Sequence, residues 1–291
     1  MSARVVVIGD AMLDVIVRPL GPVAPTSDTP SRIRISRGGS AANIAVALAR
    51  SCAVTYVGVV GDDETGAMFA RDLEHAGVVA RLHVVPGSTG VVVAMVDSDG
   101  QRAMMSERGV NPELSVDHVH EVLSGRFDHL HVSGYTVLDA ATRHVASAAL
   151  RLARDRGAST SVDACSVAPL ERMGADEFLG AIGRVTMLFS NEEEALALSR
   201  EGDVESASQR LSSLVDEVVI TRGPLGALVR RGSEYWLAHS RNVEVLDTTG
   251  AGDAATGAYV AARLGGSACD EALELAMASA AQVVGHLGAS D

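Results

Sequence analysis

The residues best placed to do chemistry lie near the end of the sequence, where DTTGAGDAATGAY covers positions 247–259. Gly250, Ala251 and Gly252 come directly before Asp253, and the residues that follow predict a helix. Small residues let a backbone turn approach a ligand closely, and the first N–H groups of a helix attract an anion such as phosphate. A carboxylate repels anions, but it can remove a proton from a hydroxyl group that attacks a phosphate. The motif therefore predicts a phosphate cradle with Asp253 as a general base.

Two other interpretations of this motif exist. In the first, Asp253 only interacts favourably with the helix dipole, and the glycines make a tight turn. In the second, GAGDAA matches the loose Gly-x-Gly-x-x-Gly/Ala pattern of dinucleotide-binding proteins. That pattern belongs in a first βα unit, with an acidic residue at the end of the next strand. Because only helix follows here, the dinucleotide interpretation is the weaker one.

Composition excludes several classes of protein. The 291 residues carry a net charge of −13, which argues against a nucleic-acid partner, since such a partner needs a basic face. All 24 basic residues are arginine, so the lysine of a Walker-type phosphate loop is missing. If this chain binds phosphate, it must use backbone N–H groups, arginine and a metal ion.

The sequence also predicts the cellular compartment. Cys52, Cys165 and Cys269 lie far apart in no metal-binding spacing, which is typical of reduced thiols. The N-terminal RVVVIGD is too short and too lightly charged for a signal peptide, and no apolar run is long enough to span a membrane. We therefore expect a soluble, cytoplasmic protein with no membrane partner.

The elements that must position the motif alternate between strand and helix. A buried strand over 4–10 comes first, followed by a helix over 40–50 and a strand over 53–61. From residue 127 onward the expected strands are 128–132, 159–163, 186–189 and 217–221, and the expected helices are 140–156, 192–200 and 207–214. This alternation predicts an α/β fold with a mostly parallel central sheet and helices on both faces. Short strands near 14–17 and 32–36, and a hairpin over 88–111 that turns at DSDG, predict a small accessory sheet.

Three further motifs accompany the first: RGGSAANIAVALA (37–49), SNEEEA (190–195) and TRGPLGAL (221–228). The four occur in the order seen in the ribokinase-like carbohydrate kinases, the PfkB family, which the chain resembles over nearly its whole length. The resemblance implies a single Rossmann-like domain over 1–291, with a small β-sheet lid formed by about 11–37 and 88–108. It also implies ATP-dependent phosphorylation of a sugar or nucleoside hydroxyl.

The resemblance implies roles on the catalytic and nucleotide side. Asp253 resembles the catalytic base, and the turn before it resembles the anion hole. Asn191 and Glu194 resemble the Asn-x-x-Glu that organises Mg²⁺ and its waters at the ATP phosphates, although they are also typical of a helix start. The other implied positions are Thr221, Gly223 and Gly226 in a nucleotide-facing loop, and Asp247, Thr249, Val283 and Gly288 around a monovalent cation such as K⁺.

The resemblance also implies a substrate side. Asp14 matches an aspartate that binds sugar hydroxyls, and Gly38, Gly39 and Asn43 match a Gly-Gly-x-x-x-Asn element that holds the same ring. Asp10 is assigned to the same side, with the alternative that it only ends the first strand.

Some residues depart from the family pattern. Where ribokinases place a glutamate that touches ribose, HVSGYT offers Gly134 and Tyr135, so Tyr135 could face a base or a different sugar. Arg108 either packs within the lid or reaches an anionic substrate or phosphate. His129 and His131 share a strand face, and we expect them to be hydrogen-bonded within the sheet rather than to bind a metal.

The sequence therefore predicts a ribokinase-type sugar kinase that uses ATP and Mg²⁺, with K⁺ as a further cofactor and a homodimer joined through the lid. One alternative is a nucleoside kinase of the adenosine or pseudouridine type, although the aromatic content of 3% favours a bare sugar. Another is a non-catalytic nucleotide or sugar sensor, which would need neither Asp253 nor the Asn-x-x-Glu pair. The particular sugar and the phosphorylated hydroxyl stay open.

Overall fold

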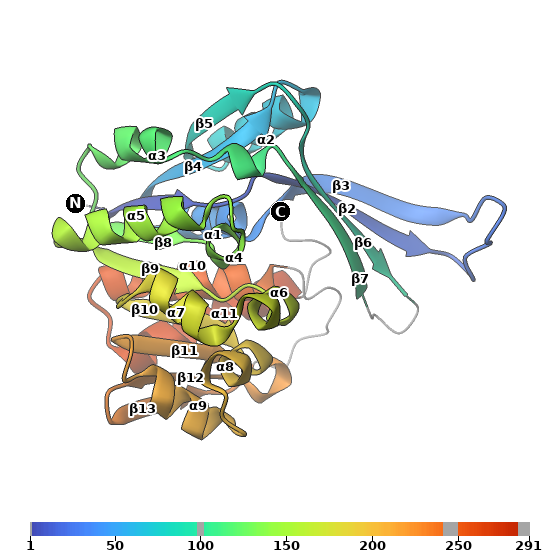
Figure 1. Ribbon diagram of the computed structural model, residues 1–291. Helices are drawn as coiled ribbons and strands as arrows, with labels where there is room; N and C mark the ends of the chain where they lie inside the picture. Colours follow the sequence, from blue (N-terminus) through green and yellow to red (C-terminus); the bar gives the residue numbers. More distant parts are fainter. Residues whose placement is uncertain (1, 98–101, 241–249, 285–291) are drawn as a thin grey trace.

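The computed structural model describes residues 2–97, 102–240 and 250–284 (Figure 1). Its main sheet has nine strands: β1 (Arg4–Ile8), β4 (Ala53–Gly61), β5 (Val79–Val85), β8 (His129–Val132), β9 (Ser159–Asp163), β10 (Met187–Asn191), β11 (Glu217–Thr221), β12 (Ala227–Arg231) and β13 (Glu234–Ala238). They lie in the order β13-β12-β11-β10-β9-β8-β1-β4-β5. The strands from β11 to β5 are parallel, and β12 and β13 add an antiparallel edge. The α/β fold class predicted from the sequence is confirmed.

Helices cover both faces of this sheet. One face packs against α3 (Val116–Leu123), α5 (Arg143–Asp155), α7 (Ala175–Ile182), α8 (Glu192–Ser199) and α9 (Val204–Leu211). The other face packs against α1 (Ser40–Ala49), α2 (Glu64–His75), α10 (Ala251–Leu264) and α11 (Cys269–Val284). The short helices α4 (Gly134–Leu138) and α6 (Val167–Met173) follow β8 and β9, and single 3-10 turns lie at Asn111–Glu113 and Gly223–Leu225.

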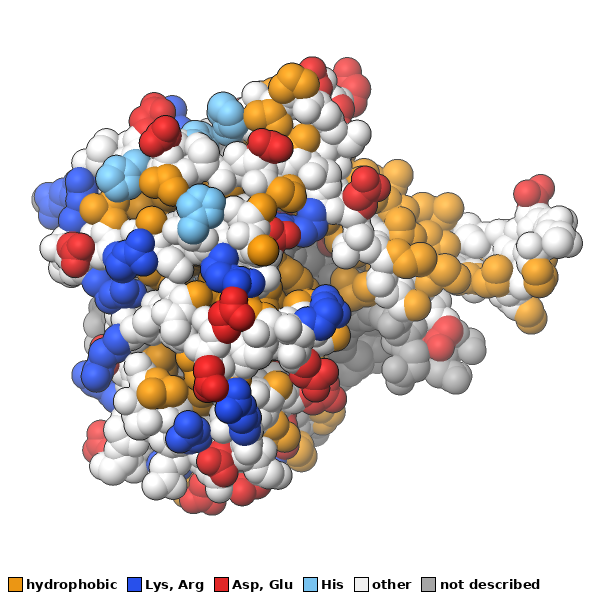
Figure 2. Space-filling view, in the orientation of Figure 1, with side chains coloured by type: hydrophobic (Ala, Val, Ile, Leu, Met, Phe, Trp, Pro, Cys, Tyr) orange, Lys and Arg blue, Asp and Glu red, His pale blue; other side chains and the backbone are white. Residues whose placement is uncertain are grey.

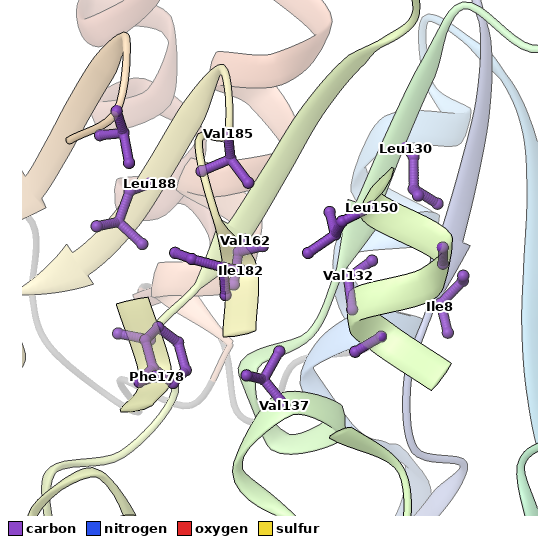
Figure 3. Packing of buried hydrophobic residues seen from close by; sticks show 14 of the residues in the cluster. Ile8, Leu130, Val132, Val137, Leu150, Val162, Phe178, Ile182, Val185 and Leu188 are labelled. Atoms are coloured by element: carbon purple, nitrogen blue, oxygen red, sulfur yellow. The ribbon is translucent and has the colours of Figure 1, made fainter. Parts of the chain in front are cut away.

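Burial on both faces explains why the strand sequences are continuous runs of apolar residues. Within β1, Val6 and Ile8 join one buried cluster, whereas Val5 and Val7 join the other, because successive side chains point to opposite faces. Figure 3 shows the first cluster, in which strand residues such as Val132 meet helix residues. Burial of each such side chain contributes about 1.5–3 kcal/mol. The sheet is therefore a rigid base, and its strand ends hold side chains in fixed positions.

A second, smaller sheet, which we call the lid, has four strands: β2 (Met12–Pro19), β3 (Ser31–Gly38), β6 (Thr89–Val96) and β7 (Arg102–Gly109). Their order is β3-β2-β6-β7; β2 and β6 are parallel, and the outer pairs are antiparallel. Figure 1 shows this sheet extending away from one end of the main sheet. It is the small accessory sheet expected from the sequence, with β2 and β3 longer than predicted. Most of the expected DSDG turn, residues 98–100, lies outside the described residues.

Element boundaries show where sequence patterns were insufficient. The helix expected over 207–214 begins three residues earlier, because the Asp203 side chain accepts a hydrogen bond from the N–H of Ser206 and caps it there. The helix expected over 140–156 starts at Arg143, after the separate α4. None of the helices in the described ranges is long and apolar enough to cross a membrane.

Candidate active site

A cavity of about 680 Å³ lies at the carboxyl ends of the parallel strands, the edge where open α/β sheets bind ligands. The lid lines one wall with Asp14, Val92 and Ser106, which are direct neighbours across β2, β6 and β7 and so share one face. The rest of the wall comes from strand ends and from residues of α1, α4, α6, α8, α10 and α11. The cavity therefore reaches from the lid to the start of α10, where the DTTGAGDAATGAY motif places Asp253.

Asp253 lies in the first turn of α10 and lines this cavity. Its Oδ1 accepts a hydrogen bond from Ser40 Oγ at 2.8 Å, and its Oδ2 accepts one from Asn43 Nδ2 at 2.9 Å. Burial raises the pKa of Asp253 to about 6, although these two hydrogen bonds favour the ionised form. The group is thus a carboxylate at neutral pH, with the proton affinity expected of a general base.

The turn before Asp253 leaves space for an anion. Gly250 has φ 77°, a left-handed conformation that suits glycine, and it directs the chain into α10. No side chain of the described residues caps this helix, so its first N–H groups stay available. A Cβ at Gly252 would meet nothing within 4 Å, which means that the cavity is open on that side. The arrangement fits a phosphate at a helix N-terminus.

Asn43 connects Asp253 to the lid. Its Nδ2 donates to Asp253, and its Oδ1 accepts from Arg37 Nη1 at 3.0 Å. Arg37 is the next-to-last residue of strand β3 and is only 4% exposed. Asn43 was expected to hold the sugar ring, and it lines the cavity. However, its amide nitrogen and its amide oxygen already make hydrogen bonds to the side chains of Asp253 and Arg37.

Two glycines of the same motif shape the substrate side. A Cβ at Gly38 would overlap the carboxylate of Asp14, and a Cβ at Gly39, which has φ 91°, would lie 2.5 Å from the carbonyl oxygen of Asp10. Glycine at these positions lets Asp14 lie against β3. Burial raises the pKa of Asp14 to about 6, and the nearby Arg37 opposes that shift.

Asp10 follows β1 and also lines the cavity. Its carboxylate accepts two hydrogen bonds from Arg108 of β7, and Arg108 Nη1 also pairs with Asp139. Asp10 therefore does more than end the strand, because it joins the lid to the main sheet. The guanidinium that could meet an anionic substrate already faces two carboxylates.

On the nucleotide side, Asn191 and Glu194 form a capping box at the start of α8. The N–H of Glu194 donates to Asn191 Oδ1 at 2.8 Å, and Glu194 Oε2 accepts from the N–H of Asn191 at 2.9 Å. Both residues also line the cavity. Burial, with Asp163 and Glu193 nearby, raises the pKa of Glu194 to about 7. A buried carboxylate of this kind is stabilised by a cation.

The remaining residues predicted to contact ATP or a monovalent cation lie at the ends of β11 and α11 and in the turn after β11, or outside the described residues. Thr221 ends β11 and lines the cavity. Gly223 and Gly226, with φ 53° and 91°, form the turn between β11 and β12. Val283 lies in the last turn of α11. Asp247, Thr249 and Gly288 lie outside the described residues.

Sequence reasoning missed Asp163 at the end of β9. It is 8% exposed and accepts hydrogen bonds from Cys165 Sγ at 3.0 Å and from the N–H of Gly134 at 3.0 Å, and Ser40 Oγ lies 2.9 Å from its Oδ2. Although burial raises its pKa, these hydrogen bonds and His131 outweigh burial and lower it. Asp163 could have been found from the sequence, since it ends a predicted parallel strand as Asp10 does.

The strand histidines make hydrogen bonds within the sheet. His129 bonds to Ser159 and Ser161 through its two ring nitrogens, and His131 Nδ1 bonds to Ser161. Burial lowers the pKa of His129 to about 3, so its ring is neutral. In the described part of the chain, no group of three His, Cys, Asp or Glu residues could hold a metal ion.

With this geometry in view, comparisons with known proteins define the family. The model for the pfkB family carbohydrate kinases matches residues 2–291. The chain belongs to this family. The recognition made from the four sequence motifs is thereby confirmed.

Several proteins that this chain resembles are also kinases. An ATP-dependent ribose-1-phosphate kinase from Halopiger xanaduensis is 33% identical over 273 residues, which cover 91% of this chain and 87% of the relative. An adenosine kinase from Sinorhizobium meliloti has a TM-score of 0.90 at 25% identity and covers 100% of this chain and 96% of its own. An E. coli structure assigned as ribokinase II, in complex with ATP and Mg²⁺, has a TM-score of 0.86 at 25% identity, with coverage of 99% and 94%. This pfkB kinase is an ATP-dependent sugar or nucleoside kinase.

Proposed function

We propose that this kinase transfers the γ-phosphoryl group of ATP to a hydroxyl of a small sugar, with Asp253 as the general base. The observation that carries the proposal is that Asp253, the open turn before it and Asp14 of the lid line one cavity. Asp253 takes the proton of the attacking hydroxyl. The N–H groups at Gly250, Ala251 and Gly252, with the dipole of α10, stabilise the charge on the transferred group.

Asp14 supports a hydroxyl-rich substrate. Its carboxylate accepts hydrogen bonds from two neighbouring sugar hydroxyls, which neutral side chains do less well. Since Gly38 lets this carboxylate lie flat against β3, the lid itself holds the ring. Asp14 thus selects the sugar, and Asp253, held by Ser40 and Asn43, acts on the hydroxyl that faces it.

A nucleoside is the second candidate. Met12, Val92 and Met104 of the lid, and Tyr135 of α4, give the cavity an apolar lining that could hold a base. The likeness to an adenosine kinase supports this alternative. The Halopiger relative adds ribose 1-phosphate as a compound to test, with Arg108 as its candidate partner.

The residues around Glu194 fit Mg²⁺ bound together with the ATP phosphates. The proposal is that Glu194, through water, and Asn191 hold the ion, because a buried carboxylate near Asp163 is stabilised by a cation. Mg²⁺ would bridge phosphate oxygens and offset their charge. A K⁺ ion near Asp247 and Thr249, completed by backbone near Val283 and Gly288, is part of the proposal on family resemblance.

The wider organisation is proposed as well. We propose one kinase domain over 1–291, with lid segments at about 11–37 and 88–108, in a cytoplasmic protein without nucleic-acid or membrane partners. Hydrophobic side chains gather on the lid in Figure 2. By strand register, Ile35 and Met105 lie on the face of the lid opposite to Asp14, in one row with Val15 and Val93, and both are exposed. This face supports a homodimer joined through the lid.

The test is ADP formation with a panel of ribose, fructose, ribose 1-phosphate and adenosine, with Mg²⁺ and with Na⁺ or K⁺. We expect a free sugar to give the highest kcat/KM, and mass and NMR spectra of the product to identify the phosphorylated hydroxyl. A preference for adenosine would support the nucleoside alternative, and a preference for ribose 1-phosphate would make Arg108 its partner. ATP binding without turnover of any acceptor, across a broader panel, would favour a sensor. Equal rates in Na⁺ and K⁺ would refute the monovalent site.

A further inference from the structure

The hydroxyl of Ser40 lies between two carboxylates. Ser40 Oγ is 2.8 Å from Asp253 Oδ1 and 2.9 Å from Asp163 Oδ2, although the three residues come from α1, α10 and β9. A serine hydroxyl has one proton to donate. It can therefore donate to only one of these carboxylates at a time. The second contact becomes a hydrogen bond only when a carboxyl group carries a proton.

The two carboxylates differ in how they are held. Asp163 accepts from Cys165 Sγ and from the N–H of Gly134, and His131 Nε2 lies 3.5 Å away, so donors surround it. Asp253 is held at Oδ2 by the Nδ2 of Asn43, which can only donate. Its Oδ1 faces Ser40, a group that can both donate and accept. Hence Asp253 is the member of this pair that can change protonation state without losing a partner.

We propose that Ser40 and Asp163 are positioning residues that serve both protonation states of the general base. Before transfer, Ser40 donates to Asp253 Oδ1. After Asp253 has taken the proton of the attacking hydroxyl, its carboxyl O–H donates to Ser40 Oγ, and the hydroxyl of Ser40 turns to Asp163 Oδ2. One O–P bond forms to the acceptor, the bond from the γ-phosphorus to the bridging oxygen of ATP breaks, and one proton moves to Asp253. The inference rests on the proposed function.

The charges around the pair give the two residues opposite effects on the base. The groups that face Asp253 are Asp163 and His131 from the strands, Arg37 from the lid and Tyr135 from α4. Glu194 and Cys165 lie on the side of Asp163. Beyond the dominant effect of burial, the hydrogen bond from Ser40 lowers the pKa of Asp253, and the charge of Asp163 raises it.

The experiment is the pH dependence of kcat/KM between pH 5 and 9 for Ser40→Ala, Ser40→Thr and Asp163→Asn. Ser40→Ala should lower kcat about tenfold or more, which is the usual effect of one lost hydrogen bond to a charged group. It should also move the acidic limb of the pH profile, where the rate falls as the base takes up a proton, to higher pH. Asp163→Asn should also lower kcat, but should move the acidic limb to lower pH. Ser40→Thr, which keeps the hydroxyl, should restore most of the activity. Dissociation constants for sugar and Mg·ATP should stay within about twofold, since neither residue is needed for binding.

Ser147→Ala is the matched control. Its hydroxyl, in α5, bonds to the carbonyl of Ala181 far from the cavity, so this variant should keep the wild-type profile. The inference would be overturned if both Ser40→Ala and Asp163→Asn kept the wild-type kcat and acidic limb. It would also be overturned if these variants lost substrate affinity and kcat to the same extent. If Asp163→Asn does not fold, the comparison of Ser40→Ala with Ser40→Thr decides. A wild-type enzyme without phosphoryl transfer would instead refute the proposed function itself.

Discussion

Arg108 of the lid donates to both carboxylate oxygens of Asp10, from Nε and from Nη2, at 2.7 Å each. Asp10 lies just beyond β1, which ends at Ile8, so this contact joins the two sheets at the wall of the cavity. Asp139 pairs with the remaining guanidinium nitrogen, Nη1. Bidentate pairs between charged groups fix geometry as well as distance. The position of the lid over the acceptor substrate therefore depends on a contact that touches both sheets.

Loss of this contact should weaken acceptor binding. We expect Arg108→Ala to raise the KM for the sugar about tenfold, with a smaller change in the KM for ATP, because the lid loses a charge-assisted pair. Arg108→Lys should bring the KM for the sugar only slightly back toward the wild-type value, since an ammonium group cannot make two parallel hydrogen bonds to a carboxylate. Initial rates at varied sugar and fixed ATP measure the effect.

Arg200→Ala is the control for this series. Arg200 pairs with Asp176, and both side chains are well exposed, so its loss should leave rates unchanged. If Arg108→Ala raises the KM for a sugar phosphate far more than the KM for the free sugar, then Arg108 contacts the phosphate group of that acceptor. An unchanged KM for all acceptors would mean that the contact has no part in acceptor binding.

Gly38→Ala should reproduce the effect of Asp14→Ala. The added methyl group would occupy the space of the Asp14 carboxylate and push it away from the sugar. For either variant we expect a KM for the sugar about 10- to 100-fold higher, as for a lost charged hydrogen bond, with the KM for ATP little changed. Gly180→Ala in α7 is the control, because a Cβ there meets nothing within 4 Å. Equal changes in both KM values would mean that Asp14 and Gly38 serve structure rather than the acceptor.

The sequence predicted much of this site because each motif is local. The turn at Gly250, the capping box at Asn191 and the Gly-Gly pair need only neighbouring residues, and their chemistry can be read directly from spacing. The contacts among motifs could not be read in this way. Ser40 meets Asp163 and Asp253 across 123 and 213 positions of sequence, and the packing of α1 against α10 and against the end of β9 brings them together. Asp163 stayed unnoticed because a single aspartate at a strand end is a weak signal.

Glu194→Gln should raise the Mg²⁺ concentration needed for half-maximal rate by about 10- to 100-fold, the usual range for a group that orients a metal's waters. Glutamine can still accept the N–H of Asn191 and keep the cap of α8, so folding should not change. The control is Glu193→Gln, because Glu193 is exposed beside it. The measurement is the initial rate at constant ATP and increasing Mg²⁺. Identical Mg²⁺ curves for the wild type and Glu194→Gln would remove Glu194 from the metal site, and turnover in excess EDTA would refute the need for Mg²⁺.

The last prediction concerns Asp253 and pH. Asp253→Asn should lower kcat by about a hundredfold or more, with ATP and sugar affinities nearly intact, because a general base is lost but its volume is kept. Burial raises the pKa of both Asp253 and Asp14 to about 6, and each must be ionised to act, so wild-type kcat/KM should fall as pH drops through 6. Because both groups must lose a proton, this fall should be steeper than that of a single titrating group. In Asp14→Ala and in Asp253→Asn alike, the acidic limb should become that of a single group, the carboxylate that remains. Near wild-type turnover in Asp253→Asn would show that another group removes the proton.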